Sequence, residues 1–261
     1  MDPIAFQLGG FAIHWYGVLV ALGFLAGLWT ASRRAPLGGI PADRIADLGP
    51  WLIAGGILGA RLLYVLTYWN TAFAGRPWYE VLMIHKGGLV FYGGLIGATL
   101  ATVIFARLKK IPLWALADVL APSISLGQVF GRLGCLMNGC CFGHASAAPW
   151  AIRFPADHET AGQPVHPTQV YEAGLSALLY AGLAALFRRK RFDGQVFAVY
   201  LVAYPLVRSV VEVFRGDYKA LSFGVLTPAH WVSAGILAAG LLLWWKLPRT
   251  LAPPAGASST K

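Results

Sequence analysis

The sequence is poor in charged residues. Asp, Glu, Lys and Arg make up 12% of its 261 residues, whereas hydrophobic residues make up 57%. Because about 25% of the residues of an average soluble domain are charged, this composition excludes an ordinary soluble globular protein. Acidic residues are the scarcer kind, with 11 Asp and Glu against 21 Lys and Arg. No basic stripe interleaved with aromatic residues occurs outside the flanks of the apolar segments, so nucleic-acid binding is not indicated.

The chain is instead rich in long apolar segments, which predict a membrane protein. About 20 apolar residues, rising 1.5 Å each, cross a hydrocarbon core of roughly 30 Å. Seven spans are predicted, at about 12–31, 47–69, 88–106, 114–134, 169–187, 195–214 and 228–246. The first lacks a basic leader and a small-residue cleavage site, so we expect it to remain as an anchor. The predicted fold class is an all-α membrane protein, with residues 1–247 as a single polytopic transmembrane domain and residues 248–261 as a disordered tail.

The basic residues of the short connections predict the orientation, because Lys and Arg concentrate in cytoplasmic loops. Every second connection, together with the C-terminal tail, is basic: these segments carry Arg33, Arg34, Arg44, Arg107, Lys109, Lys110, the RRKR run at 188–191, Lys246, Arg249 and Lys261. The C-terminus is therefore predicted to be cytoplasmic. The N-terminus and an irregular loop region at about 135–168 are predicted to face outward.

Topology leaves some charges inside or at the outer ends of apolar spans unexplained, namely Arg61, Arg132, Arg208, Glu212 and Arg215. An arginine at the bilayer centre costs about 2.5–3.5 kcal/mol on insertion scales, so such residues should face a polar cavity. In YPLVRSVVEVFRGD, one helical face carries Tyr204, Arg208, Glu212 and Arg215. One interpretation is an internal Arg–Glu pair that joins helices. The surplus of arginine over carboxylate favours a second interpretation, in which these residues form a binding site for a phosphate. Arg61 is expected to be a structural partner of Asp47 or of a helix end.

Glycines surround two aromatic residues in GGLVFYGGLIGA at 87–98. Gly94 and Gly97 are explained as well by close helix packing as by a ligand site. Gly87 and Gly88, at the start of a span, favour a tight turn or an exposed group of backbone N–H donors that a ligand can approach.

All three cysteines lie in GRLGCLMNGCCFG at 131–143. Cys135, Cys140 and Cys141 have no paired CxxC spacing, and His144 is the only obvious fourth ligand, so a zinc site is the least favoured interpretation. A disulfide from Cys135 to Cys140 or Cys141 and plain buried thiols both remain open.

Seven stretches of the sequence, in this order, resemble the motifs of one family. They are HWYG (14–17), GARLLYVL (59–66), GGLVFYGGLIG (87–97), GRLGCLMNGCCFG (131–143), PWAIRFP (149–155), HPTQVYE (166–172) and YPLVRSVVEVFRGD (204–217). Together they are similar to the ordered motifs of bacterial prolipoprotein diacylglyceryl transferases, over about residues 8–247. The resemblance implies a multi-pass enzyme of the bacterial inner membrane. That enzyme moves the diacylglyceryl group of phosphatidylglycerol to the lipobox cysteine of a prolipoprotein, forming a thioether and releasing glycerol 1-phosphate. Its partners would be phosphatidylglycerol, prolipoprotein signal peptides with a lipobox cysteine, and membrane lipids.

The resemblance also implies roles for individual residues. Arg132 and Arg208 would be the essential residues on the phosphate side, and Glu212 would orient Arg208. The other residues expected to line or shape the substrate site are Tyr16, Gly87, Gly88, Asn138, Gly143 and Tyr204.

The sequence departs from the best-known members at Tyr92, where they carry the histidine of an HGG motif. A phenol is a poor base at neutral pH unless a cation activates it. Tyr92 is therefore expected either to be an activated catalytic base or to hydrogen-bond the lipid phosphate. His14, His85 and His166 are further candidates for the base, although an interfacial hydrogen-bonding role is favoured for each.

The residues themselves fit this reaction. Displacing a glycerol phosphate by a thiol needs a stabilised phosphate charge, a proton acceptor and a water-poor pocket. The reaction is neither redox nor hydrolytic and outward carboxylates are few, so we expect no metal and no dissociable cofactor. Two other functions stay open: a non-catalytic lipid- or lipoprotein-binding paralogue, and a lipid-translocating membrane protein, against which the lack of a half-to-half repeat counts.

Overall fold

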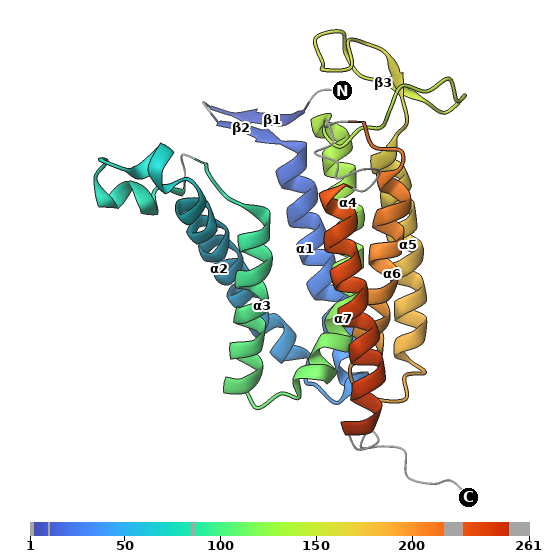
Figure 1. The fold of residues 1–261 in the computed structure, drawn as a ribbon. Helices are drawn as coiled ribbons and strands as arrows, with labels where there is room; N and C mark the ends of the chain where they lie inside the picture. Colours follow the sequence, from blue (N-terminus) through green and yellow to red (C-terminus); the bar gives the residue numbers. More distant parts are fainter. Residues whose placement is uncertain (1–2, 10, 85–86, 217–226, 251–261) are drawn as a thin grey trace, which may run out of the picture. The chain divides into compact units, whose positions relative to one another are not determined.

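Seven long helices account for the predicted spans. The computed structural model describes residues 3–9, 11–84, 87–216 and 227–250 (Figure 1). Within these ranges seven helices are long and apolar enough to cross a membrane. They are α1 (Trp15–Arg34), α2 (Ala42–Thr67), α3 (Phe91–Leu108), α4 (Leu113–Asn138), α5 (Thr168–Phe187), α6 (Gln195–Glu212) and α7 (Pro228–Thr250). The all-α membrane fold is confirmed. The orientation of the termini stays a prediction. His85 and residues 251–261 of the predicted tail lie outside the described residues, whereas residues 248–250, also predicted as tail, are the last three of α7.

The chain divides into two compact units. The first contains residues 1–31 and 117–261, and the second contains residues 32–116. The expectation of one domain over residues 1–247 stays a prediction.

Glycines allow α2 and α3 to pack closely in the second unit. A Cβ atom on Gly59 would collide with the carbonyl oxygen of Gly93, and one on Gly97 would collide with that of Gly55. Small residues at such crossings let helix backbones approach each other. The packing role considered for Gly97 is therefore confirmed.

Three short helical segments belong to the second unit, and Arg61 contacts two of them. The segments are the 3₁₀ helix η1 (Ala35–Gly38), the π-helical turn η2 (Trp69–Phe73) and the 3₁₀ helix η3 (Trp78–Leu82), and Arg61 lies against Phe73 of η2 and the carbonyls of η3. From α2, the guanidinium donates hydrogen bonds of 2.7 to 3.2 Å to the carbonyl oxygens of Glu80, Val81, Gly87 and Gly88. The predicted pairing of Arg61 with Asp47 is wrong, because the Asp47 carboxylate instead lies 3.6 Å from the guanidinium group of Arg44. Arg61 is a structural residue whose partners are carbonyls of η3 and of the turn before α3.

The first unit packs α1, α4, α5, α6 and α7 through close approaches and a few polar bridges. A Cβ atom on Gly23 of α1 would lie 2.8 Å from Cβ of Phe130 in α4. The Ser125 hydroxyl of α4 donates a 2.8 Å hydrogen bond to the carbonyl oxygen of Ser176 in α5. Gln128 Nε2 of α4 donates to the Tyr200 hydroxyl of α6 at 3.1 Å. The helix α4 thus contacts α1, α5 and α6.

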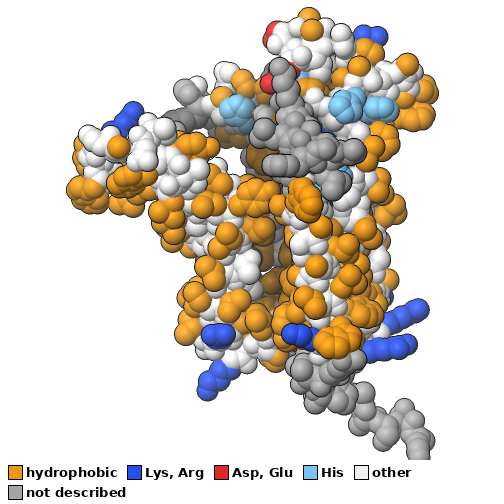
Figure 2. Space-filling view, in the orientation of Figure 1, with side chains coloured by type: hydrophobic (Ala, Val, Ile, Leu, Met, Phe, Trp, Pro, Cys, Tyr) orange, Lys and Arg blue, Asp and Glu red, His pale blue; other side chains and the backbone are white. Residues whose placement is uncertain are grey.

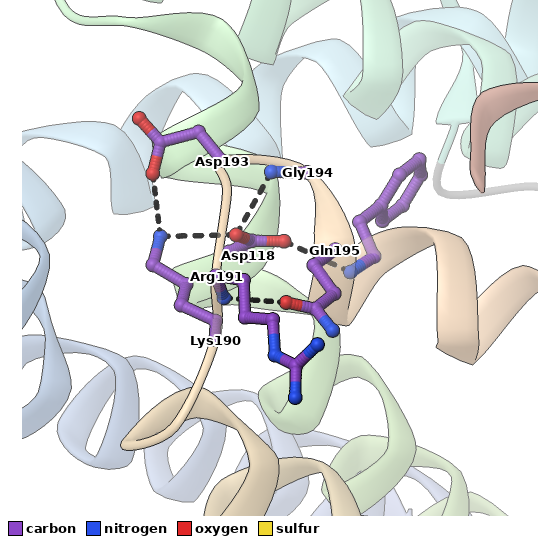
Figure 3. Close-up of polar contacts among 7 residues, drawn as sticks. Asp118, Lys190, Arg191, Asp193, Gly194 and Gln195 are labelled. Carbon is purple, nitrogen blue, oxygen red and sulfur yellow. Dashed lines mark hydrogen bonds and ion pairs between the residues drawn. The ribbon is translucent and has the colours of Figure 1, made fainter. Parts of the chain in front are cut away.

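A buried carboxylate near the start of α4 fixes the start of α6 (Figure 3). Asp118 is fully buried, and its two oxygens accept hydrogen bonds from Gly194 N at 2.9 Å and Phe197 N at 3.0 Å. Lys190 Nζ lies 3.0 Å from the same carboxylate and 2.7 Å from Asp193. An anion at a helix N-terminus satisfies the unpaired N–H groups there and favours the helix dipole. We call Asp118, Lys190, Asp193 and the N–H groups of Gly194 and Phe197 the Asp118 network.

Two small antiparallel sheets complete the first unit, and the sequence patterns did not predict them. The strands β1 (Ile4–Leu8) and β2 (Phe11–His14) form a hairpin before α1. The strands β3 (Ile152–Arg153) and β4 (Pro164–Val165) pair within the region expected to be irregular. These strands are short, and β3 and β4 are too short for an alternating pattern to show in the sequence.

The outer surface of the helices is apolar. Figure 2 shows hydrophobic side chains along the helices of each unit, with Lys and Arg side chains at their lower ends. Large apolar side chains such as Leu58, Phe91 and Leu178 are 69%, 76% and 70% exposed. In water such a surface would aggregate, whereas in a bilayer it contacts lipid. The surface thus agrees with a multi-pass membrane protein.

Candidate active site

The helix α4 runs four residues further than the predicted span and carries most of the cysteine-rich stretch. It ends at Asn138, and Gly139 has the left-handed φ of 76°. Cys140 N donates to the carbonyl oxygen of Cys135, and Gly139 N donates to that of Leu136. These two bonds form a Schellman motif, the usual way in which a glycine ends a helix. The loop expected from residue 135 therefore begins at residue 139, and Arg132 and Cys135 are helical.

Arg132 forms a buried ion pair with a carboxylate of α5. Its Nη2 atom lies 2.9 Å from Glu172 Oε1, and the two side chains are 20% and 2% exposed. Glu172 also lies within electrostatic reach of Arg208 and Arg215. Glu172 was not predicted from the sequence as a site residue, although a carboxylate within an apolar span is itself a signal of a polar site.

Arg208 and Glu212 form a second buried ion pair, within α6. Arg208 Nη1 lies 2.5 Å from Glu212 Oε2, and the side chains are 14% and 1% exposed. Glu212 Oε1 also accepts a 2.7 Å hydrogen bond from the Thr227 hydroxyl. The Arg–Glu pair predicted from the spacing is present. One carboxylate uses only part of the five N–H donors of a guanidinium group.

Two predicted tyrosines lie beside Arg132. Tyr204 of α6 is close enough to Arg132 to hydrogen-bond it, and its ring stacks on that of Tyr200 with centroids 5.7 Å apart. Tyr16, at the start of α1, lies against Gly134 of α4, where an added Cβ atom would be 3.1 Å from its ring. The first unit thus brings together Tyr16, Arg132 and Tyr204.

The loop after α4 is fastened to the end of α6 at Gly143. His144 N donates to the carbonyl oxygen of Phe214, and Gly216 N donates to that of Phe142. A Cβ atom on Gly143 would lie 2.6 Å from Cβ of His166 and 2.7 Å from the carbonyl oxygen of Phe214. Only glycine fits there, which gives Gly143 a shaping role and holds Arg215, its bridge partner, near the loop.

The three cysteines meet beside this arginine site. Their Sγ atoms all lie within 4.8 Å of one another, and all three thiols are free. The pKa of the Cys141 thiol is lowered, first because the thiols of Cys135 and Cys140 hydrogen-bond it and then because Arg215 and Arg132 add positive charge. Of the interpretations that the sequence left open, the structure shows clustered thiols and no disulfide among these three residues.

Tyr92, Gly87 and Gly88 belong to the second unit. Tyr92 is in the first turn of α3 and is 56% exposed. Gly87 and Gly88 have φ of 83° and 77°, and a Cβ atom on Gly88 would collide with the ring of Tyr64. The two glycines form the predicted turn. A part for Tyr92 in catalysis stays a prediction.

Two of the described histidines, His158 and His166, contact structural partners. His166 Nδ1 lies 3.1 Å from the Tyr171 hydroxyl, and its ring contacts that of Phe214 at a centroid distance of 5.3 Å. His158, which the sequence analysis did not consider, has its Nε2 atom 2.7 Å from the carbonyl oxygen of Gly139. His14 is the last residue of β2. The interfacial hydrogen-bonding role expected for His166 agrees with its contact to Tyr171.

Comparison with known proteins gives one consistent result. The sequence model of a family described as prolipoprotein diacylglyceryl transferase matches residues 3–246. A phosphatidylglycerol–prolipoprotein diacylglyceryl transferase of Synechococcus elongatus is 38% identical over 250 residues, which cover 92% of this chain and 85% of the relative. Relatives with the same name from Bordetella avium and Agrobacterium fabrum are 37% and 34% identical, over 93% and 91% of this chain and 93% and 86% of their own lengths.

Proposed function

The chain belongs to the prolipoprotein diacylglyceryl transferase family, and from that premise we propose that the arginine site at the end of α4 carries out its reaction. The enzyme transfers the diacylglyceryl group of phosphatidylglycerol to the lipobox cysteine of prolipoproteins. A thioether forms and glycerol 1-phosphate is released. The relatives' names do not favour the non-catalytic paralogue or the lipid translocator.

One observation supports this assignment most strongly: two largely buried arginines from different helices act on one carboxylate. Arg132 and Arg208 both lie within electrostatic reach of Glu172, and each arginine is paired with one carboxylate, Glu172 or Glu212. A guanidinium group has five N–H donors, so a carboxylate on one edge leaves donors for a second anion. A phosphate diester suits that position, because the planar guanidinium group binds phosphate oxygens in pairs.

In the proposed mechanism, Glu172 and Glu212 orient the arginines and the arginines bind the lipid phosphate. Each carboxylate occupies one edge of its guanidinium, so the other N–H groups remain for phosphate oxygens. As the bond between the lipid carbon and the phosphate oxygen breaks, negative charge grows on the leaving glycerol phosphate. Donors that are already in position stabilise that charge without reorganising, which is the main source of rate enhancement in such sites.

The neighbouring residues shape the pocket in this proposal. Tyr16 and Tyr204 flank Arg132 and would contact the glycerol head group, while Asn138 and Gly143 fix the helix end and the loop beside it. Tyr92 would donate a hydrogen bond to the phosphate or accept the thiol proton.

The function is tested by transfer itself. Purified protein is mixed with phosphatidylglycerol labelled in its acyl chains and with a peptide that carries a lipobox cysteine. We expect labelled thioether on the peptide and an equal amount of glycerol 1-phosphate. A peptide with serine in place of the cysteine is the matched control and should stay unlabelled. Binding of phosphatidylglycerol without any product would instead identify a non-catalytic lipid-binding protein.

A further inference from the structure

The cysteine cluster has the dimensions of a metal site. The chain contains three cysteines, and the Sγ atoms of Cys135, Cys140 and Cys141 all lie within 4.8 Å of one another. Three sulfur atoms bound to one zinc ion at about 2.3 Å lie roughly 4 Å apart. Small side-chain rotations are therefore enough to bring all three sulfurs onto one ion. The sequence spacing hid this arrangement, because it contains no CxxC pair.

Three side-chain hydrogen bonds hold the backbone that carries the cysteines. The carbonyl oxygens of Gly139, Cys140 and Cys141 each have a side-chain partner, at distances of 2.6 to 2.7 Å, and the partners are His158, Gln169 and Thr168 respectively. Cys141 itself has a left-handed φ of 64°, a conformation that residues other than glycine seldom adopt. Ligands of a metal site are typically positioned by such supporting hydrogen bonds.

The cluster offers three protein ligands. Within the part of the chain that the structure describes, no histidine or carboxylate joins the three sulfurs. Structural zinc sites have four protein ligands, whereas catalytic zinc sites have three and keep the fourth position for water or substrate. Three thiolates on a divalent ion carry one net negative charge, which the nearby Arg132 and Arg215 offset. Tyr16 and Arg132 of the proposed site are in the same neighbourhood.

We propose that Cys135, Cys140 and Cys141 bind one zinc ion, whose open position takes the thiol of the lipobox cysteine and binds it as the thiolate. This rests on the proposed function and supplies a means of thiol activation in a chain with Tyr92 at the position of the family's histidine. It departs from the expectation of an enzyme without a metal.

The reaction balances without an oxidant or reductant. On binding, the thiol releases its proton, because a thiol that coordinates a metal is deprotonated outright. The sulfur forms a bond to the lipid carbon, and the bond from that carbon to the phosphate oxygen breaks. The electron pair of the broken bond leaves with glycerol 1-phosphate, and the released proton goes to its phosphate or to water. The thioether is a weaker ligand than the thiolate, so the product can dissociate.

The metal site is tested first with cobalt alone. Reduced protein, stripped of metal with a chelator, is titrated with Co²⁺, which gives a thiolate charge-transfer band in the near ultraviolet and strong tetrahedral bands in the visible. We expect saturation at one equivalent and complete reversal by Zn²⁺. Cys135→Ser, Cys140→Ser and Cys141→Ser should each weaken binding by at least about 10-fold, the scale on which metal-site mutations act. The His144→Gln control should keep the bands unchanged.

Three outcomes would overturn the site. Wild-type protein without the charge-transfer band would exclude thiolate binding, and this result does not depend on the folding of any variant. Fewer than three alkylatable thiols in freshly purified, unreduced protein that contains no zinc would identify a disulfide instead. Loss of the bands in His144→Gln would mean four protein ligands and no position for a substrate.

The catalytic part is tested with the lipobox peptide. Adding the peptide to the cobalt protein should shift the bands towards those of four thiolates, and the serine peptide should not. Stripped protein should transfer diacylglyceryl at least about 100-fold more slowly, the scale on which removing a general base acts, and one equivalent of Zn²⁺ should restore it. Full transfer by zinc-free protein would overturn this inference and leave the proposed function intact. A peptide-induced shift without transfer from phosphatidylglycerol would contradict the proposed function and leave the site intact.

Discussion

The two ends of α4 carry two buried polar networks that differ in how completely their groups are paired. Near the start of the helix, Asp118 accepts two backbone hydrogen bonds and pairs with Lys190. Fourteen residues further along, Arg132 pairs with Glu172, and a second pair, Arg208 with Glu212, lies in the same site. The first network closes around one carboxylate, whereas in the second each guanidinium group has N–H donors beyond those that face its carboxylate.

This difference separates structural charges from functional ones. Lys190, one of the basic residues that predicted the orientation of the chain, is 9% exposed and has two carboxylate partners. Its role is to complete the Asp118 network at the start of α6. Both networks sit in apolar surroundings, where an unpaired group is costly. A network that keeps donors beyond its own pairs is therefore the better candidate for ligand binding, and the proposed ligand is the lipid phosphate.

The largest effect is expected from Arg132→Ala, which breaks the incomplete network. Removing a charge-assisted hydrogen bond to the phosphate in a dry site should lower transfer by about 10²–10³-fold or more. The transfer assay with phosphatidylglycerol measures it. Arg153→Ala, an equal change of charge at an exposed residue of the same unit, is the control and should remain active. Equal losses in the two variants would show that charge in general, and not phosphate binding, is being measured.

Asp118→Asn breaks the complete network and should affect stability instead of chemistry. Removing one partner of a buried ion pair lowers the free energy of unfolding by about 3–5 kcal/mol. We expect a lower Tm in detergent and near-normal transfer per folded molecule. Asp193→Asn is the matched control, because the Asp193 side chain is 32% exposed whereas that of Asp118 is 0% exposed. It should lower the free energy of unfolding by less than about 1 kcal/mol. A strong loss of transfer with an unchanged Tm in Asp118→Asn would contradict the structural role that we assign to the Asp118 network.

Arg208→Lys sharpens the comparison, because it keeps the charge and removes the planar fork. A lysine could still pair with Glu212 but could not bind two phosphate oxygens in parallel. We expect transfer to fall by about 10–100-fold, because one specific interaction with the transition state is removed. The variant should keep the Tm of the wild type. Normal turnover would show that Arg208 acts only as a charge.

The smallest effect is expected from Arg61→Lys in the second unit. Arg61 donates hydrogen bonds to backbone carbonyls, and lysine would forgo several of them, each worth about 0.5–1.5 kcal/mol. Transfer per folded molecule should stay close to that of wild type, while the Tm should fall modestly. A loss of transfer as large as that of Arg208→Lys would move Arg61 from the structural to the functional group.

Hydropathy alone was sufficient to predict the seven spans, and the i, i+4 spacing was sufficient to predict the pair of Arg208 with Glu212. Both signals are local, since they depend on neighbouring residues of one helix. The partner of Arg132 could not be predicted in this way, because Glu172 is 40 residues away in another helix.

The cysteine cluster was missed for a related reason. It depends on a Schellman turn and a left-handed Cys141, which are backbone features that spacing in the sequence does not reveal. The Asp118 network joins α4 to the start of α6 across more than 70 residues, so it too could be found only in three dimensions.

The division into two units also sets an order of events on the ribosome. The second unit is continuous in sequence and can form once residue 116 has left the ribosome, whereas the first joins residues 1–31 to residues 117–261. Translation adds about 5–20 residues per second, so several seconds or more separate the synthesis of Arg132 from that of Thr227. The hydroxyl of Thr227 donates a hydrogen bond to Glu212 of the site. During that interval the site of the nascent chain is still incomplete. Premature termination anywhere before α7 should therefore release an inserted but inert fragment, with no shorter active form.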